Sequence, residues 1–413
     1  MRLSSSIVLV LLPACFAARP IAETARAAET SSPRAFNEDV EANAARLFAQ
    51  GQDTFRWDSL GSEAFWGDQL KMHEVFIGRG IGRRGLSPRR LLQLGLKIDV
   101  GAVPTVLATS LREGAGAGLD DPRNTVELLR AGAVVGVVAV QDRFDRITAI
   151  GVSCALCHST VDDVVSPGVG RRLDGWPNRD LDVGALLSMA PVTAPLEDLF
   201  HDDAATVRQR LQAWGPGRSD AFLGKGGNGL RGDGETAAVL IPAAFGLAGQ
   251  PLHAGWGSIP CWDAFFINGG TSRDDDDDAR SRLPALQFYQ LAIPAPRPAI
   301  GSFDVASAAR GRDVFNGAAR CGSCHVPPLF AEPDAALHTG SEIGIDEATS
   351  ARTPDGLYRT SPLAGLFARG KGGYYHDGRF ADLAAVVAHY ERALPVRLHD
   401  DERDDLIEYL KSL

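Results

Sequence analysis

The sequence CALCH at residues 154–158 has a counterpart, CGSCH, at residues 321–325. Both follow the pattern Cys-x-x-Cys-His, in which two thiols stand about one helical turn apart and an imidazole follows directly. This arrangement suits covalent attachment of haem, because the thiols can add to its two vinyl groups while the histidine ligates the iron. We therefore predict two c-type haems, each at the centre of its own domain.

Four cysteines are the predicted attachment sites and two histidines the predicted iron ligands: Cys154, Cys157 and His158 in the first motif, then Cys321, Cys324 and His325 in the second. A zinc site and a thioredoxin-like cysteine pair are the alternatives for a Cys-x-x-Cys pattern. Neither explains the histidine that follows both pairs, and no further cysteine pair lies at zinc-ribbon spacing.

The composition is that of a globular protein, with 45% hydrophobic and 23% charged residues in 413. This length is sufficient for two or three domains. A formal net charge of −10 argues against nucleic acid as a partner.

The N-terminal residues 1–27 resemble an export signal, with Arg2 before a short apolar run and Ala25-Arg26-Ala27 as a cleavage site. The run is shorter than the roughly 20 residues that a membrane span requires. Cys15 lies in a weak lipoprotein-like sequence, so lipid anchoring is an alternative to cleavage. Either route predicts a periplasmic protein, and it leaves Cys261 without a predicted disulfide partner.

We predict a mainly α fold, with an added helical N-terminal region at 28–132, a first haem domain at 133–296 and a second, cytochrome c-like haem domain at 297–413. In the N-terminal region, helices are expected at Phe36–Gln50, closed by Gly51, and after the Ser87-Pro88 and Asp121-Pro122 pairs, at Arg89–Leu96 and Arg123–Arg130.

A small β-hairpin, formed by Ala133–Val140 and Arg146–Val152, is expected to lead into the first motif. Later in this domain, the acidic run Asp274–Asp278 is expected to be a solvated loop, with a calcium site as the alternative. The proline-rich segment Ile293–Pro298 predicts a stiff connector to the second domain.

In the second domain, Asp304 is expected to cap a helix that precedes CGSCH, and a further helix ends the chain. Small cytochromes c cross their first and last helices through a glycine and an aromatic pair. Gly311, Phe315 and Tyr409 could supply that contact here; two unrelated amphipathic helices are the alternative.

Methionine, the usual sixth ligand of an electron-carrier haem c, is absent from the second domain, because the chain has only Met1, Met72 and Met189. The remaining side chains of the second domain that could donate to iron are His338, Tyr358, Tyr374, Tyr375, His376, His389, Tyr390, His399 and Tyr409.

The stretch Arg352–Glu391, which contains GGYYHDGRFADLAAVVAHYE, resembles the C-terminal haem domain of bacterial di-haem cytochrome c peroxidases and their MauG-type relatives. In that family the sixth ligand follows fourteen residues after the histidine of a His-Asp-Gly turn, as Met in peroxidases and Tyr in the MauG type. From His376 this position is Tyr390, with His389 as the substitute. The resemblance implies a place for His376 near a haem edge or propionate.

The same resemblance implies that the first haem is the reactive one and that a tryptophan connects the two haems. Trp214 and Trp176 are the candidates, and Trp214 is preferred for its WGPGR setting. Glu235 is the candidate distal acid or base, although the Pro-x-Glu-Met context usual in the family is absent. The candidates for the sixth position of the first haem, which could also be open, are Met72, His73, Met189, His201 and His253.

Segments Phe55–Phe76, Trp214–Asp220 and Ile241–Gly246 also resemble larger di-haem oxidoreductases, including rubber oxygenases. Together these resemblances imply an exported oxidoreductase that reacts with hydrogen peroxide and exchanges electrons with a small redox protein, a cytochrome c or a cupredoxin, or with an oxidisable substrate. The alternatives are a non-catalytic periplasmic electron-transfer cytochrome and an oxygenase that uses dioxygen on an apolar substrate. Calcium, held by carbonyls near Lys371 and Gly373, is a further candidate cofactor.

Overall fold

The computed structural model describes residues 33–79, 84–112, 117–220, 229–232, 234–248, 276–332, 336–353 and 355–413. The chain divides into two units, Met1–Ala44 and Ala45–Leu413. In the first unit the described residues are helical and carry an Arg34–Glu38 ion pair at 3.2 Å. The predicted export signal at 1–27, Cys15 and Cys261 lie outside the described residues.

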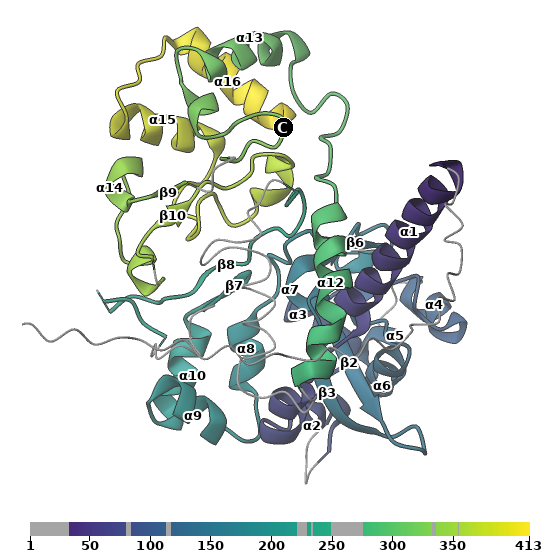
Figure 1. Cartoon of the computed structure of the whole chain (residues 1–413). Coiled ribbons are helices and arrows are strands. Elements are labelled where there is room, and N and C mark those ends of the chain that lie inside the picture. The colour runs from purple at the N-terminus through teal and green to yellow at the C-terminus, as the bar shows by residue number, and fades with distance from the viewer. Residues whose placement is uncertain are drawn as a thin grey trace, which may run out of the picture. The chain divides into compact units, whose positions relative to one another are not determined.

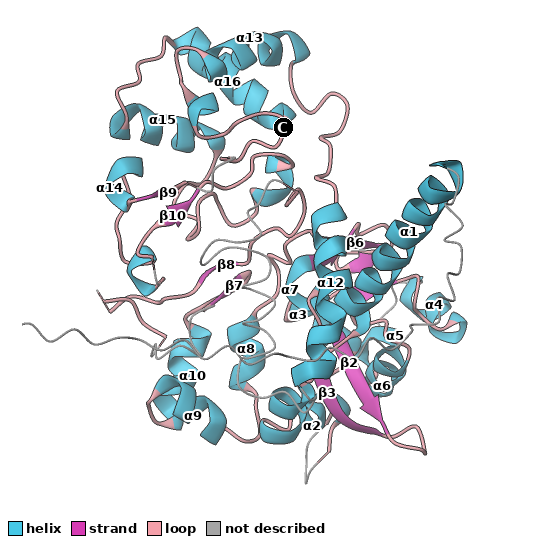
Figure 2. Cartoon of the chain, viewed as in Figure 1, coloured by secondary structure: helices cyan, strands magenta, loops and turns pink. Residues whose placement is uncertain are grey.

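Helices dominate the described chain, as the mainly α prediction requires (Figures 1 and 2). From the N-terminus to the first motif they are α1 (Pro33–Trp57), the π-helix η1 (Ala64–Gln69), α2 (Met72–Ile77), α3 (Pro88–Gln93), α4 (Thr105–Arg112), α5 (Ala117–Asp120), α6 (Pro122–Arg130) and α7 (Ala155–His158). Those that follow are α8 (Val183–Ser188), α9 (Ala194–Phe200), α10 (Ala204–Gln212), α12 (Asp276–Ala292), α13 (Val305–Asn316), the 3₁₀ turn η3 (Cys321–Ser323), α14 (Gly340–Ile343), η4 (Ser350–Arg352), η5 (Leu366–Arg369), α15 (Leu383–Ala393) and α16 (Asp400–Ser412).

The strands pair two by two and form no large sheet among the described residues (Figure 2). The predicted hairpin is confirmed, because Val137 pairs with Val152 in an antiparallel ladder. The pairs are β2 (Val137–Gln141) with β3 (Ile147–Val152), β4 (Ser159–Val161) with β6 (Arg172–Asp174), β7 (Arg218–Ser219) with β8 (Val239–Leu240), β9 (Leu337–His338) with β10 (Tyr358–Arg359), all antiparallel, and β1 (Ile98–Asp99) with β5 (Val169–Gly170), which is parallel.

The predicted helix starts in the N-terminal region are confirmed at two caps. The Ser87 side chain accepts from the backbone N–H of Arg90, and the Asp121 side chain accepts from that of Arg123. A proline follows each cap, where its missing N–H leaves no helix bond unmade.

Two local predictions are wrong. Gly51 does not end α1, which continues to Trp57. A Cβ at Gly51 would lie 2.0 Å from the Ala285 carbonyl oxygen, so this glycine allows α1 to pack closely on α12. Asp276–Asp278 form the first turn of α12 and not a loop, and the rest of the acidic run lies outside the described residues.

The predicted crossing in the C-terminal region is confirmed. A Cβ at Gly311 of α13 would lie 1.9 Å from the Asp405 carbonyl oxygen of α16, so only glycine permits this approach. The rings of Phe315 and Tyr409 meet edge to face beside it, with centroids 5.2 Å apart. Helices α13, α15 and α16 consequently form one group in Figure 1.

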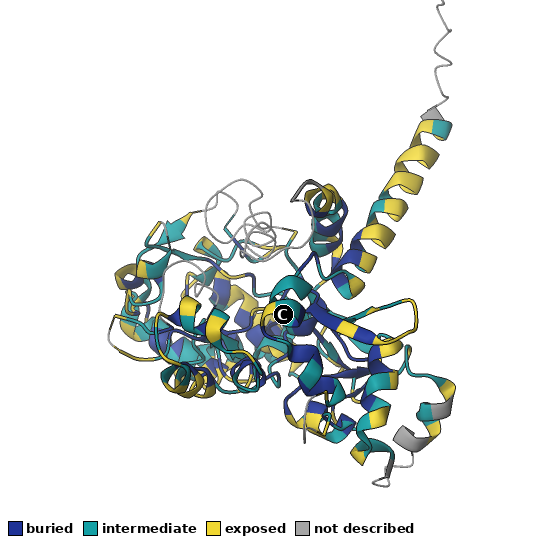
Figure 3. Cartoon of the chain, turned by 90° about the horizontal axis from the view of Figure 1, so that it is seen from below, coloured by how far each residue is buried: buried dark blue, intermediate teal, exposed yellow. Residues whose placement is uncertain are grey.

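Buried side chains form three clusters within Ala45–Leu413. Figure 3 colours the buried residues dark blue along the chain. The largest surrounds α2, α6, β3 and α8, a second lies between α1 and α12, and the third contains Phe315, Leu406 and Tyr409. The boundary at 296/297 remains a prediction, although the third cluster draws its buried residues from the C-terminal region alone. None of the described helices combines the length and the apolar character that a membrane span needs.

Candidate haem sites

The first motif is fixed in a buried frame. Strand β3 delivers the chain to Ser153, whose hydroxyl donates to the Arg56 carbonyl at 2.9 Å, and α7 begins directly afterwards. Gly136, with φ +74°, passes so close behind α7 that a Cβ would lie 2.0 Å from the Leu156 nitrogen. The Asn178 backbone N–H donates to the Cys157 carbonyl at 2.8 Å. The backbone of the motif is therefore held from both sides.

His158 has the polarity that an axial iron ligand needs. Its Nδ1 lies 3.0 Å from the Pro242 carbonyl, which makes Nδ1 the protonated nitrogen and leaves Nε2 as the lone-pair donor. Burial lowers the pKa of His158 and so favours the neutral, metal-binding imidazole. Burial also raises the pKa of the Cys157 thiol to about 12.

The second motif has the same contact between histidine Nδ1 and a backbone carbonyl, in different structural surroundings. Arg320 adopts a left-handed conformation, with φ 54°, and the chain enters the 3₁₀ turn η3. His325 Nδ1 lies 3.2 Å from the Phe330 carbonyl, and burial lowers its pKa as well. Burial raises the pKa of the Cys321 thiol to about 11. All four motif cysteines are free thiols, so the donor set fits two covalently attached haems.

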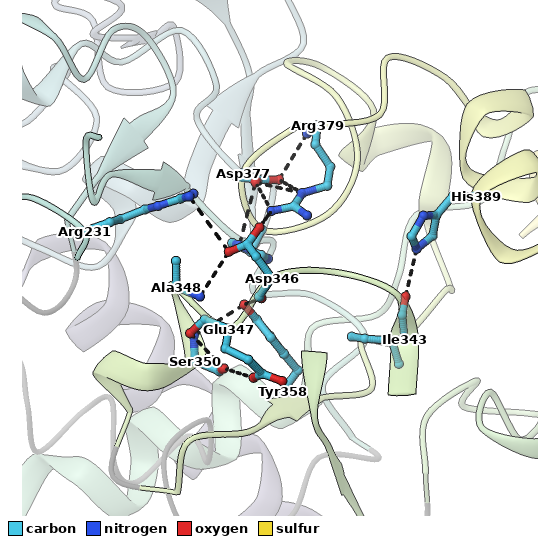
Figure 4. Close-up of polar contacts among 11 residues, drawn as sticks. Arg231, Ile343, Asp346, Glu347, Ala348, Ser350, Tyr358, Asp377, Arg379 and His389 are labelled. Carbon is cyan, nitrogen blue, oxygen red and sulfur yellow. Dashed lines mark hydrogen bonds and ion pairs between the residues drawn. The ribbon is translucent and has the colours of Figure 1, made fainter. Parts of the chain in front are cut away.

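Tyr390, the predicted sixth ligand, lies on α15 in buried surroundings. Burial raises the pKa of its phenol, and the nearby thiols Cys321 and Cys324 of the second motif act in the same direction. His389, the substitute, uses its Nε2 to contact the Ile343 carbonyl at 2.8 Å (Figure 4). That hydrogen bond gives His389 a structural role and favours Tyr390 as the predicted iron ligand.

His376 lies in a tight turn after Tyr375. Its ring stacks on Tyr358 with centroids 5.3 Å apart, its backbone carbonyl accepts from the Leu240 N–H, and its Nε2 is buried without a hydrogen-bond partner among the described residues. Burial lowers the pKa of this imidazole. The neighbouring Asp377 and Arg379 form an ion pair that extends to Asp346 (Figure 4). His376 is thus a neutral buried donor or acceptor.

The two tryptophans lie in different surroundings. Trp214 is 4% exposed and stacks on Phe200 of α9, within the largest core cluster. Trp176 contacts Phe245 and, from the C-terminal region, Phe367, with ring centroids 6.3 and 5.8 Å away. The residue before Trp176, Gly175, donates its N–H to the His158 carbonyl. Trp176 therefore follows a residue that is hydrogen-bonded to the first motif, and its own ring contacts the second region.

Glu235 lies in an exposed turn, in which its carbonyl accepts from the Arg231 N–H. It lines an open pocket of about 410 Å³ together with Thr206, Gln209, Arg210, Ala213, Gly229, Leu230, Gly234 and Thr236. This exposure differs from the dry pocket that usually surrounds a catalytic carboxylic acid. The role of Glu235 as a distal acid remains a prediction.

The candidates for the sixth position of the first haem are scattered. Met72 is fully buried in α2, and the adjacent His73 is buried with its Nδ1 unpartnered among the described residues. Met189 caps the C-terminus of α8, and His201 ends α9 in a left-handed conformation on the surface. His253 lies outside the described residues.

One cluster of side chains was not predicted from the sequence. The side chains of Cys324, Glu332 and His338 offer ligand atoms within 4.8 Å of one another, and Glu332 accepts from His338 at 2.8 Å and from the Thr360 hydroxyl at 2.6 Å. Because Cys324 belongs to the second motif, we interpret Glu332 and His338 as neighbours of that haem. No sequence spacing joins these residues.

The proposed calcium carbonyls are in a cationic environment. The Lys371 carbonyl accepts from Arg179 Nη1 at 3.2 Å, and the Lys371 ammonium pairs with Asp180. The Arg179 guanidinium therefore already hydrogen-bonds one of the carbonyls that calcium would need. The positive charges of Arg179 and Lys371 also disfavour calcium binding there.

No family model matches the chain. Among curated proteins, the chain is similar to methylamine utilization protein MauG of Methylorubrum extorquens, with 28% identity over 179 residues that cover 38% of this chain and 50% of MauG. The chain thus spans half the length of this relative. The resemblance to MauG-type proteins, predicted from the His-Asp-Gly turn, is confirmed by this similarity.

Among solved structures, a chain of Kuenenia stuttgartiensis hydrazine synthase is similar over 46% of this chain and 78% of its own length, with 19% identity. The TM-score of this match is 0.30.

Proposed function

We propose that this protein is an exported di-haem c-type cytochrome that acts as an oxidoreductase, with hydrogen peroxide as the oxidant and a small redox protein or an oxidisable substrate as the electron source. The observation that carries the proposal is the paired arrangement of the motifs. Both histidines direct Nδ1 to a backbone carbonyl, at 3.0 Å for His158 and 3.2 Å for His325. The similarity to MauG supports the same class.

The two motifs would hold the cofactors in complementary ways. Cys154 and Cys157 would anchor one haem in the buried frame, and Cys321 and Cys324 the other beside Tyr390. When bound, haem supplies a redox-active iron suited to electron transfer and to peroxide chemistry. A phenolate from Tyr390 favours the ferric state, which suits storage of oxidising equivalents better than fast electron shuttling.

The chain between the motifs would carry electrons. We assign the aromatic connection to Trp176 in preference to Trp214, because Trp176 contacts Phe367 of the second region while Trp214 packs within the core. His376, whose pKa is lowered by burial and whose Nε2 has no hydrogen-bond partner among the described residues, would donate or accept a hydrogen bond at the edge of the second site.

Spectroscopy on the protein from a host that matures c-type cytochromes tests the proposal. A pyridine haemochrome assay and mass spectrometry should give two covalent haems per chain. The ferric spectrum should contain a high-spin, five-coordinate component, and one equivalent of hydrogen peroxide should change the spectrum quickly. Two low-spin irons that are inert to peroxide would instead indicate an electron-transfer cytochrome, and fewer than two haems would end the proposal.

A further inference from the structure

Two arginines lie at the junction between the first motif and the C-terminal region. Arg179 follows Asn178, which is tied to the Cys157 carbonyl. Arg369 ends η5 and places its guanidinium 4.7 Å from the ring centre of Phe245, the same ring that Trp176 contacts. The junction therefore combines aromatic contacts with two positive charges.

Both guanidinium groups are poorly satisfied for buried cations. The Nε of Arg179 and the Nε of Arg369 are buried without a hydrogen-bond partner among the described residues. Arg179 donates to the Lys371 carbonyl. The hydrogen bonds of Arg369 to described residues are long contacts, 3.4 Å each, to the carbonyls of Phe245 and Ala364. These carbonyls are neutral, so they leave the positive charge uncompensated.

Neighbouring arginines repel the positive charges of Arg179 and Arg369. Burial lowers the pKa of Arg179 and of Arg369 to about 10 each, and neighbouring arginines act in the same direction: Arg218 on Arg179, and Arg179 with Arg359 on Arg369. Asp180 is the adjacent acid, but its two oxygens already pair with Lys97 and Lys371. A buried group of cations such as this is stable only when an anion completes it.

We propose that Arg179 and Arg369 form a carboxylate site that binds a propionate of the haem attached at the first motif. The inference rests on the proposed function, because it takes that haem as the occupant. A carboxylate is the planar anion that a guanidinium binds with two parallel hydrogen bonds. The first motif is the nearer source by connectivity, since Gly175 and Asn178 bond to the carbonyls of His158 and Cys157.

The reduction potentials of the holoprotein test this site without measuring turnover. In Arg179→Gln and Arg369→Gln, the propionate loses a positive neighbour, so the ferric form gains stability. The ferric-to-ferrous ratio of the His158 haem at a fixed applied potential should rise about tenfold, roughly the worth of one charge-assisted hydrogen bond. Arg369→Lys, which keeps the charge, should shift this ratio less than Arg369→Gln.

Arg312→Gln is the matched control, because it removes one arginine charge from a side chain that is 64% exposed on α13. Its haem potentials should stay at the wild-type values. Unchanged potentials in both glutamine variants, with two haems present by haemochrome assay, would overturn the carboxylate site and leave the proposed function intact. A shift confined to the His325 haem would overturn the assignment to the first motif. Fewer than two haems in the wild type would overturn the proposed function itself. If Arg369→Gln does not fold, Arg179→Gln and Arg369→Lys decide the question.

Discussion

The two Cys-x-x-Cys-His motifs have the same pattern, but they sit in different frames. The first lies on a helix between β3 and a buried asparagine, with Gly136 pressed against its backbone. The second lies in a 3₁₀ turn at the edge of a small helical group, close to Tyr390, Glu332 and His338. Each histidine meets a backbone carbonyl through Nδ1. The shared motif predicts the same mode of cofactor attachment at both places. The different residues around each motif would give each haem different chemical properties.

The largest expected effect tests how rigid the two frames are. Gly136→Ala introduces a Cβ 2.0 Å from the Leu156 nitrogen at a residue with φ +74°, so it should lower the free energy of unfolding by about 3 kcal/mol. Gly322→Ala in the second motif meets the Asn316 side chain, which can move, and should cost less than about 1 kcal/mol. Urea denaturation of the holoprotein measures both. Equal losses would show that the frames are alike in rigidity.

The next effect concerns Tyr390, the predicted sixth ligand, which lies near the second motif. Tyr390→Phe removes the phenol oxygen while the ring continues to fill its buried space. The ferric spectrum of one haem should change completely, and its reduction potential should rise because the phenolate no longer stabilises the ferric state. Tyr409→Phe, which alters a phenol in the helix crossing, is the control and should leave both haem spectra unchanged. If Tyr390→Phe behaves like this control, Tyr390 is not the ligand.

A smaller effect distinguishes the roles of Trp176 and Trp214 in electron transfer between the two haems. Trp176→Phe should slow the redistribution of oxidising equivalents between the haems at least several-fold, while stability changes little. Trp214→Phe should do the reverse, lowering the free energy of unfolding by about 1–2 kcal/mol through loss of packing on Phe200. Stopped-flow spectra after peroxide addition and urea denaturation measure the two quantities. Slow electron redistribution in Trp214→Phe would restore Trp214 as the connecting residue.

The smallest effect is a pH dependence in the second frame. Burial lowers the pKa of His376 in the folded state, so the unfolded chain binds a proton more readily. His376 therefore favours folding above its unfolded pKa of about 6.5, and that contribution is lost as the pH falls below this value. His376→Gln should reduce the loss of stability between pH 7.5 and 5.5, by at most about 1.4 kcal/mol per pH unit. An unchanged pH profile would mean that His376 is hydrated in the folded protein.

Local patterns were the reliable part of the sequence analysis. Cap residues such as Ser87 and Asp121, the two strands of the hairpin and the Gly311 crossing were all predicted correctly. Each depends on residues that specify their own backbone or on a known packing geometry. Errors occurred where a distant segment decided the outcome, as when α12 packs on Gly51 and α1 continues past it.

The candidate site shows the same contrast between local patterns and contacts of distant segments. The motifs and the count from His376 to Tyr390 predicted the attachment residues and a ligand candidate, and these remain predictions. The choice between Trp176 and Trp214, the hydrogen bond that occupies His389, and the pairing of Arg179 with Arg369 could not be predicted. These features join residues that are far apart along the chain, and no spacing rule relates them.

The amino-acid sequence alone specifies the two Cys-x-x-Cys-His motifs that we predict to attach haem, because such attachment and the adjacent imidazole ligand require neighbouring residues. It also determined the helix caps and the hairpin, which depend on local backbone preferences. Contacts in the folded chain set which aromatic ring faces the second region, which histidine is already hydrogen-bonded and where, among the described residues, positive charge is buried without a paired anion. Those properties depend on distance in space and on exclusion of water, and the folded chain alone sets both.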